Sequence, residues 1–305
     1  ASYNSGSGVL TLTSAGATAT KAQWQAALQA VTYTDTSITP NTSNRTITFI
    51  SNDGNSNSNA ATKTINVIAT DQLPVVTTSG GSSSFTEGNN VVSTPVVIDS
   101  GVTVTDADNT TLASATVSIT SNFQTAEDLL AFTNSSAATY GNISASYNSG
   151  SGVLTMTSSG ATATISQWQA ALRAVTYSDS SDTPNTSNRT ISFVANDGTA
   201  NSSAATKTIS VTAVNDAPIT TTNGGVTSFT QSASGPSTPV AIDSGITVTD
   251  ADNTTLASAT VSITGSLQAA EDLLAFTNSS AATYGNISAS YNSGSGVLTL
   301  TSAGA

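Results

Sequence analysis

The sequence has 305 residues and a net charge of −12, contains neither cysteine nor histidine, and only 8% of its residues are charged. The missing residue types exclude disulfide bonds and thiol or imidazole chemistry, and the negative charge excludes nucleic acid as a natural partner. No run of about eighteen apolar residues is present, so the sequence predicts no membrane span, and no signal peptide is visible.

The chain contains an internal repeat. The seventeen residues ASYNSGSGVLTLTSAGA open and close it, and a near copy begins at Ala145, which gives a period of 144 residues without insertions. Such a period predicts a row of similar units, and proline tends to mark strand boundaries, so we place the junctions near Pro74 and Pro218. The expected units are the C-terminal part of a repeat (1–73), a complete repeat (74–217) and the N-terminal part of the next (218–305).

Most of the complete repeat alternates apolar residues with small polar ones, which is the pattern of half-buried strands. In chain order we expect strands at 101–106, 112–120 and 152–157, and two antiparallel strands joined by a hairpin loop within 189–214. In the second of these strands Ala115, Val117 and Ile119 share one face. Short strands with polar outer faces predict an all-β fold of tandem β-sandwich domains.

One segment, 164–177, has the period of a helix. Its apolar stripe consists of Ile165, Trp168, Leu172 and Val175. We expect a short helix that is capped by Ser166, with Trp168 and Leu172 fixing it onto the core of each repeat. Stacking of Trp168 on carbohydrate is the alternative. The stretch EDLLAF, residues 127–132, is expected to form a second helical turn.

Acidic residues are concentrated in one part of the repeat. In the first period this part contains Asp99, Asp106, Asp108, Glu127 and Asp128. Asp106 and Asp108 at the end of a strand would face the same way, and Ca²⁺ binds six to eight oxygen ligands of this kind, so we expect a calcium site to which Asn109 can contribute. The next copy repeats the layout at Asp250 and Asp252. A solvated turn held by an Asx hydrogen bond is the competing interpretation.

Two further acidic positions stay open at this stage. Glu127 and Asp128, with their copies Glu271 and Asp272, can complete a cation site or begin a helical turn, where acids suit the helix dipole. Asp53 and Asp197 lie in Asn-Asp-Gly turns, so we expect both to be structural.

Several motifs occur together in a fairly specific order: VNDAP, VTDADNTTLASATV, EDLLAF, GVLTMT, WQAALRAVTY and RTISFVANDG. Together they resemble the cadherin-like tandem repeats of very large bacterial surface adhesins, over the whole chain. The resemblance implies Ig/cadherin-like β-sandwich domains, each with a short inserted helix, and calcium at the domain junctions. It implies ligands from the linker at Asn215 and Asp216, from Asp250 and Asp252, and from Glu87.

The sequence also departs from the cadherin pattern. The linker pair Asn215-Asp216 is replaced in the other copy by Asp71 and Gln72, so that linker has one carboxylate at a different position. Gln231 stands where Glu87 does in the preceding repeat, which would weaken the next site. The Leu-Asp-Arg-Glu element of cadherins is not evident.

These patterns predict a structural or adhesive extracellular repeat region that forms a calcium-stiffened stalk, filament or matrix fibre of a large bacterial surface protein. Its expected partners are the neighbouring repeats, and identical chains if it polymerises. The alternative is a module that binds glycans or a partner cell through Tyr147, Tyr177 or Trp168. No convergent catalytic set is present, so we do not expect an enzyme.

Overall fold

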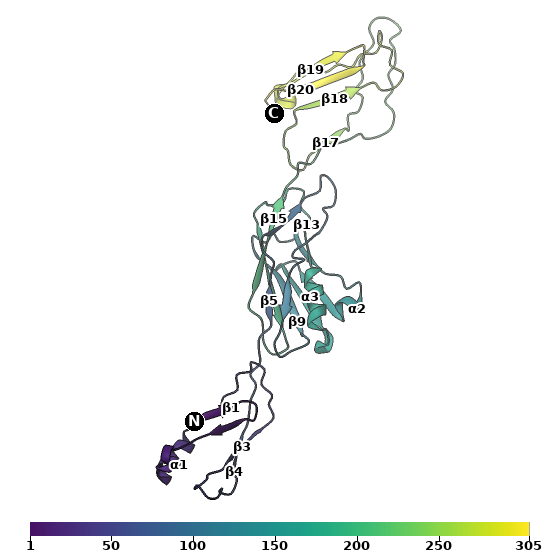
Figure 1. Ribbon diagram of the computed structural model, residues 1–305. Helices are drawn as coiled ribbons and strands as arrows, with labels where there is room; N and C mark the ends of the chain where they lie inside the picture. Colours follow the sequence, from purple (N-terminus) through teal and green to yellow (C-terminus); the bar gives the residue numbers. More distant parts are fainter. Residues whose placement is uncertain (305) are drawn as a thin grey trace.

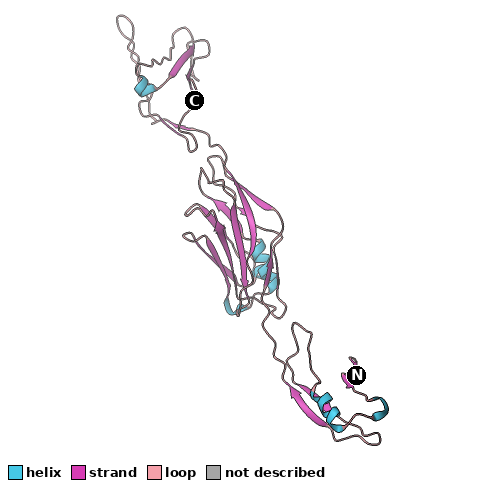
Figure 2. Ribbon diagram, turned by 90° about the vertical axis from the view of Figure 1, so that its left-hand side faces the viewer, coloured by secondary structure: helices cyan, strands magenta, loops and turns pink. Residues whose placement is uncertain are grey.

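The computed structural model describes residues 1–304, and three units follow one another along an elongated chain (Figure 1). The structure consists mostly of β-strands in several small sheets, with a few short helices (Figure 2). No helix within the described residues combines the length and the apolar character needed to cross a membrane.

The central unit contains the largest sheet, whose strand order is β11-β12-β9-β14-β15-β6. The bounds are β6 Ser82–Thr86, β9 Ser114–Ser121, β11 Ile143–Asn148, β12 Val153–Ser158, β14 Arg189–Asn196 and β15 Ala205–Thr212. All neighbours pair antiparallel except β15 and β6, which run parallel. The predicted hairpin is confirmed as β14 and β15, in a register that places Thr190 opposite Thr208.

Two smaller sheets complete this unit. One has the order β10-β13-β7 and the other pairs β5 with β8. The bounds are β5 Val75–Thr77, β7 Val96–Val97, β8 Thr103–Thr105, β10 Asp128–Ala131 and β13 Thr176–Asp179. Side chains of the large sheet and of the three-stranded sheet share one core, in which the rings of Phe85 and Tyr177 meet edge to face with centroids 5.3 Å apart. Ala115, Val117 and Ile119 are buried in this core, as predicted for one face of their strand.

The predicted helix is present as α3, Ile165–Arg173. Its N-cap is Thr164, whose side chain accepts from the backbone N–H of Gln167 while the Gln167 side chain accepts from Thr164, so the prediction of Ser166 as the cap was wrong. Trp168 and Leu172 are buried, and the Trp168 indole N–H donates to the carbonyl of Leu112 at 2.9 Å. Their predicted role in fixing the helix onto the core is confirmed.

The segment 127–132 does not form a helical turn. Residues 125–127 make a turn and β10 follows directly, antiparallel to β13. The short helix α2, Ala137–Tyr140, and the 3₁₀ turn η2, Ser159–Ala161, flank β11 and β12.

The outer units repeat parts of the central one. The first contains β1 Ser2–Asn4, β2 Val9–Thr11, η1 Ala15–Ala17, α1 Lys21–Gln29, β3 Arg45–Phe49 and β4 Ala61–Ile65. The third contains β16 Ile219–Thr221, β17 Thr247–Thr249, β18 Ser258–Ser262, α4 Ala281–Tyr284, β19 Ile287–Asn292 and β20 Val297–Ser302. Phe229 is 60% exposed although its counterpart Phe85 is fully buried, because each outer unit contains only part of the 144-residue period.

Candidate metal centre

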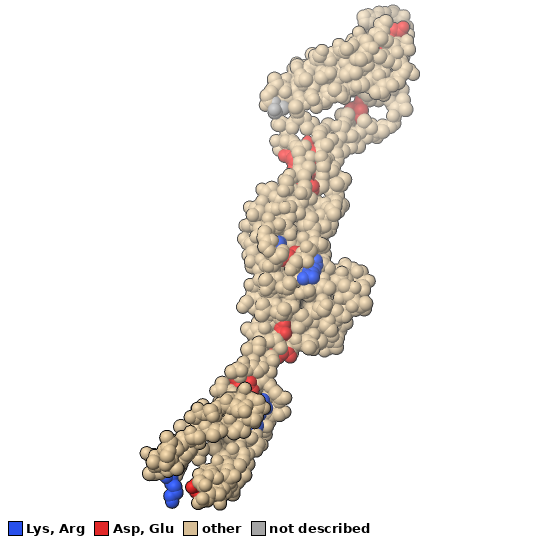
Figure 3. Space-filling model, viewed as in Figure 1, with Lys and Arg blue, Asp and Glu red and all other residues tan. Residues whose placement is uncertain are grey.

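Acidic side chains gather at the two narrow joints between the units (Figure 3). We call them the Pro74 junction and the Pro218 junction. The Pro74 junction comprises Asp71, Gln72, Asp106, Asp108 and Asp197. The Pro218 junction comprises Glu87, Asp182, Asn215, Asp216, Asp250 and Asp252.

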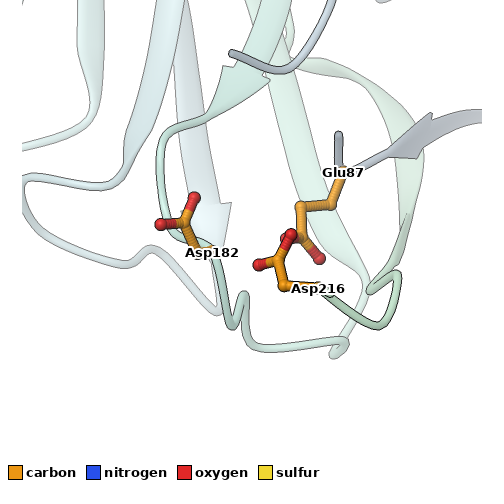
Figure 4. A group of neighbouring side chains, drawn as sticks. All are labelled: Glu87, Asp182 and Asp216. Atoms are coloured by element: carbon orange, nitrogen blue, oxygen red, sulfur yellow. The ribbon is translucent and has the colours of Figure 1, made fainter. Parts of the chain in front are cut away.

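The Pro218 junction contains a compact carboxylate triad (Figure 4). Glu87 follows strand β6, Asp182 lies in the loop after β13, and Asp216 lies in the linker after β15. One carboxylate oxygen from each residue lies within 4.8 Å of the other two. Glu87 is 4% exposed and Asp216 is fully buried, whereas Asp182 is open to solvent. The triad can therefore hold a metal ion.

Hydrogen bonds orient the two buried members of the triad. The backbone N–H of Val214 donates to Oε2 of Glu87 at 2.8 Å, and the backbone N–H of Asn90 donates to Oδ1 of Asp216. The second oxygens, Oε1 of Glu87 and Oδ2 of Asp216, are buried without a hydrogen-bond partner. A buried carboxylate oxygen without a partner is costly, and a bound cation would remove that cost.

The charges around Glu87 also disfavour its unpaired anionic form. Burial raises the pKa of its carboxyl, and the negative charges of Asp216, Asp252 and Asp182 raise this pKa further, against the hydrogen bond from Val214. Carboxylates that repel one another in a desolvated site favour either a proton or a cation.

The linker is also tied to the following unit. Oδ1 of Asp250 accepts from the backbone N–H groups of Asp252 at 3.0 Å and Asn253 at 2.7 Å, which is the Asx turn that was the alternative prediction. Oδ2 of Asp250 is buried without a partner, so the turn leaves this oxygen available to a cation. The backbone N–H of Asp216 donates to Oδ2 of Asp252, and the side chain of Asn253 donates to that of Asn215 at 3.0 Å.

The Pro74 junction repeats the turn geometry. Oδ1 of Asp106 accepts from the backbone N–H groups of Asp108 at 3.1 Å and Asn109 at 2.9 Å, while its Oδ2 is buried without a partner. Oδ2 of Asp108 accepts from the backbone N–H of Gln72 at 3.1 Å, as Asp252 does from Asp216. The second acid of the predicted pair therefore contacts its linker in both copies.

Charges accumulate at the Pro74 junction as well. Desolvation raises the pKa of the Asp71 carboxyl, and the charges of Asp197, Asp108 and Asp106 raise it further. Asp197 makes the expected turn through Oδ1, which accepts from Thr199 at 2.6 Å and Ala200 at 2.7 Å. Its Oδ2 is nevertheless buried without a partner, so Asp197 has a free oxygen at the junction in addition to its role in the turn.

Asp128 lies in an ion pair inside the central unit. Its carboxylate lies 3.1 Å from Nε of Arg189, both side chains are fully buried, and the Tyr177 hydroxyl donates to it at 2.5 Å. Asp179 lies 3.2 Å from the same guanidinium. Asp128 is thus half of an internal ion pair rather than the cation ligand or helix start considered above.

The neighbouring acids lie in local turns. The backbone N–H of Glu127 closes a turn onto the Gln124 carbonyl at 3.3 Å. Asp272 accepts from the backbone N–H of Gln268 at 2.8 Å, and Glu271 closes the equivalent turn. Among the described residues, the triad at the Pro218 junction includes none of these acids.

Sequence reasoning missed Asp182. It lies in an irregular loop whose counterpart in the first copy is Ile38, so it belongs to no repeated acidic motif. The available signal was the replacement itself, because an apolar residue is replaced by an acid between two otherwise similar copies.

The chain is similar in part to a curated protein. A stretch of 121 residues, 39% of the chain, is 36% identical to part of halomucin from Haloquadratum walsbyi. This stretch spans about 1% of the length of halomucin. No family model matches the chain, so the resemblance to cadherin-like repeats has no independent support from that comparison.

Proposed function

We propose that this chain is a segment of a long structural protein of the cell surface or extracellular space. Its repeats would be Ig/cadherin-like β-sandwich units that extend the protein, and Ca²⁺ at the junctions would stiffen it. The observation that carries the proposal is the pair of buried, unpartnered carboxylate oxygens on Glu87 and Asp216 beside Asp182. The regular period and the partial likeness to the much longer halomucin support a repetitive surface protein.

Calcium is the cation that the ligand set favours. All available ligands are carboxylate or carbonyl oxygens, and the chain has no cysteine or histidine to attract softer metals. Calcium–oxygen bonds of about 2.3–2.6 Å allow two ligands of one ion to lie up to about 5 Å apart, which accommodates the triad.

The mechanical effect follows from where the ligands lie. Glu87 and Asp182 belong to the central unit, Asp216 to the linker, and Asp252 to the next unit. Without a cation these carboxylates repel one another and favour a bent or mobile joint. A bound cation would attract ligands from both sides of the linker and hold the units at a fixed angle.

The alternative role in glycan binding has less support. Trp168 and Tyr177 are fully buried, and the hydroxyl of the half-buried Tyr147 donates to the Asp128 carbonyl at 2.7 Å. The flat aromatic surfaces that would stack on sugars are therefore used inside the unit. We also propose that the chain is not an enzyme.

Small-angle X-ray scattering of the 305-residue chain tests the proposal. We expect a greater maximum dimension and a stiffer profile in CaCl₂ than in EDTA, and a loss of the difference in Glu87→Gln. Asp53→Asn is the matched control, because Asp53 lies in an exposed turn and accepts only local N–H bonds. Identical profiles with and without calcium would refute the proposed stiffening.

A further inference from the structure

We propose that the two junctions are unequal and that divalent cation fixes the Pro218 junction at lower concentration than the Pro74 junction. This inference rests on the proposed function and adds an order of events to it. As the calcium concentration rises, the Pro218 junction would stiffen first and the Pro74 junction second.

At the Pro218 junction, Glu87, Asp182 and Asp216 form a set of carboxylates that can hold a cation from the side of the preceding unit, and we call this set the clamp. Glu87 and Asp216 are both more than nine-tenths buried, and each has one buried oxygen without a hydrogen-bond partner. Asp182 adds a third carboxylate within 4.8 Å. Two desolvated anions and a third at the rim give a cation a large electrostatic gain, because little water shields them.

Two of the three carboxylate positions of this clamp are occupied by other residues at the Pro74 junction. Ile38 occupies the position of Asp182, and it is 69% exposed. Gln72 occupies the position of Asp216, and its amide donates to the carbonyl of Thr70 at 2.9 Å. Neither residue supplies a charged oxygen to the preceding unit.

The acids that remain at the Pro74 junction lie on the other side of the linker. The carboxylate of the linker has moved by one residue, to Asp71, and it interacts with Asp106, Asp108 and Asp197 of the following unit. Asp71 and Asp108 are exposed, and Asp106 and Asp197 are only partly buried. Ile38 and Gln72 add no carboxylate to these acids, so a cation gains less on binding there.

Residue-resolved carboxylate labelling tests the order of events. The chain is stripped with EDTA, titrated with CaCl₂, labelled with a carbodiimide and glycine ethyl ester, and analysed by mass spectrometry. The exposed carboxylates Asp182 and Asp71 report on the two junctions. We expect the midpoint of protection at Asp182 to come at a calcium concentration about tenfold or more below that at Asp71.

Variants that copy one junction into the other sharpen the test. Asp216→Gln, which installs the residue of the Pro74 linker, is expected to remove the early step at Asp182 and leave the response of Asp71 unchanged. Asp182→Asn removes an exposed charge with little risk to folding and should abolish the high-affinity step in calorimetry. Asp53→Asn serves as control, and tryptophan fluorescence verifies the fold.

The outcomes separate the two proposals. Equal midpoints at Asp182 and Asp71, or an early step that survives Asp216→Gln and Asp182→Asn, overturn the inequality and leave the proposed function standing. Absence of protection at both junctions, at any calcium concentration, overturns the inequality and the proposed calcium role together.

Discussion

The buried guanidinium of Arg189 gives the sharpest prediction for stability. Its Nε lies 3.1 Å from Asp128 and its Nη2 lies 3.2 Å from Asp179, and all three side chains are fully buried. Arg189 also donates to the backbone carbonyls of Asn185 at 2.7 Å and Ser187 at 2.6 Å. Arg189→Leu would therefore leave the buried carboxylates of Asp128 and Asp179 without their cationic partner, although each keeps other hydrogen-bond donors.

The expected cost follows from this burial. Removal of one partner of a buried ion pair costs about 3–5 kcal/mol, because the remaining charge stays desolvated. The first unit supplies a matched control at the equivalent position, where Arg45 lies 3.5 Å from Asp35 and both side chains are more than a quarter exposed. Arg45→Leu should cost about 0–1 kcal/mol, as expected for an exposed pair.

Urea unfolding measures both changes. The fluorescence of Trp168 reports on the central unit if Trp24, the second tryptophan, is first replaced by Phe. We expect Arg189→Leu to lower the free energy of unfolding by several kcal/mol and Arg45→Leu to leave it nearly unchanged. A cost below about 1 kcal/mol for Arg189→Leu would refute the reasoning that the network stabilises the unit.

Three further predictions concern the same unit. Trp168→Phe removes the donor to a buried carbonyl and should cost about 1–3 kcal/mol in the same assay. Thr164→Ala removes the helix cap and should cost about 1 kcal/mol, whereas Thr164→Ser should be nearly neutral. Burial opposes ionisation of Asp99, but hydrogen bonds from Ser79 and the charge of Lys207 help to lower its pKa overall. Its stabilising effect is therefore present above about pH 4 and lost as pH falls through the lowered pKa, so the cost of Asp99→Asn should shrink in acid unfolding titrations.

Local patterns in the sequence predicted most of the central unit. Alternation over 112–120 located β9, and the helical stripe located α3 and the burial of Trp168. The cap was missed by two residues, although Thr164 followed three residues later by Gln167 is the spacing of a capping box.

The segment 127–132 could not be assigned locally. Its acids suit a helix start, but Asp128 is held by Arg189, which lies 61 residues further along the chain, and β10 pairs with β13. Long-range pairing overrides local preference in such short segments.

The candidate site was predicted in part for a different reason. The linker and Asp-x-Asp positions were visible because they repeat or match a known motif, whereas Asp182 does neither. Between copies this similar, shared residues carry little information about function, because a recent duplication would preserve neutral positions as well. The replacements carry more: Asp182 in place of Ile38 adds a carboxylate, Asn215-Asp216 in place of Asp71-Gln72 moves one by a residue, and the fold brings Asp182 and Asp216 together beside Glu87. Two independent replacements that meet at one point, next to a buried oxygen without a partner, are best explained by a ligand that the Pro218 junction binds more tightly than the Pro74 junction.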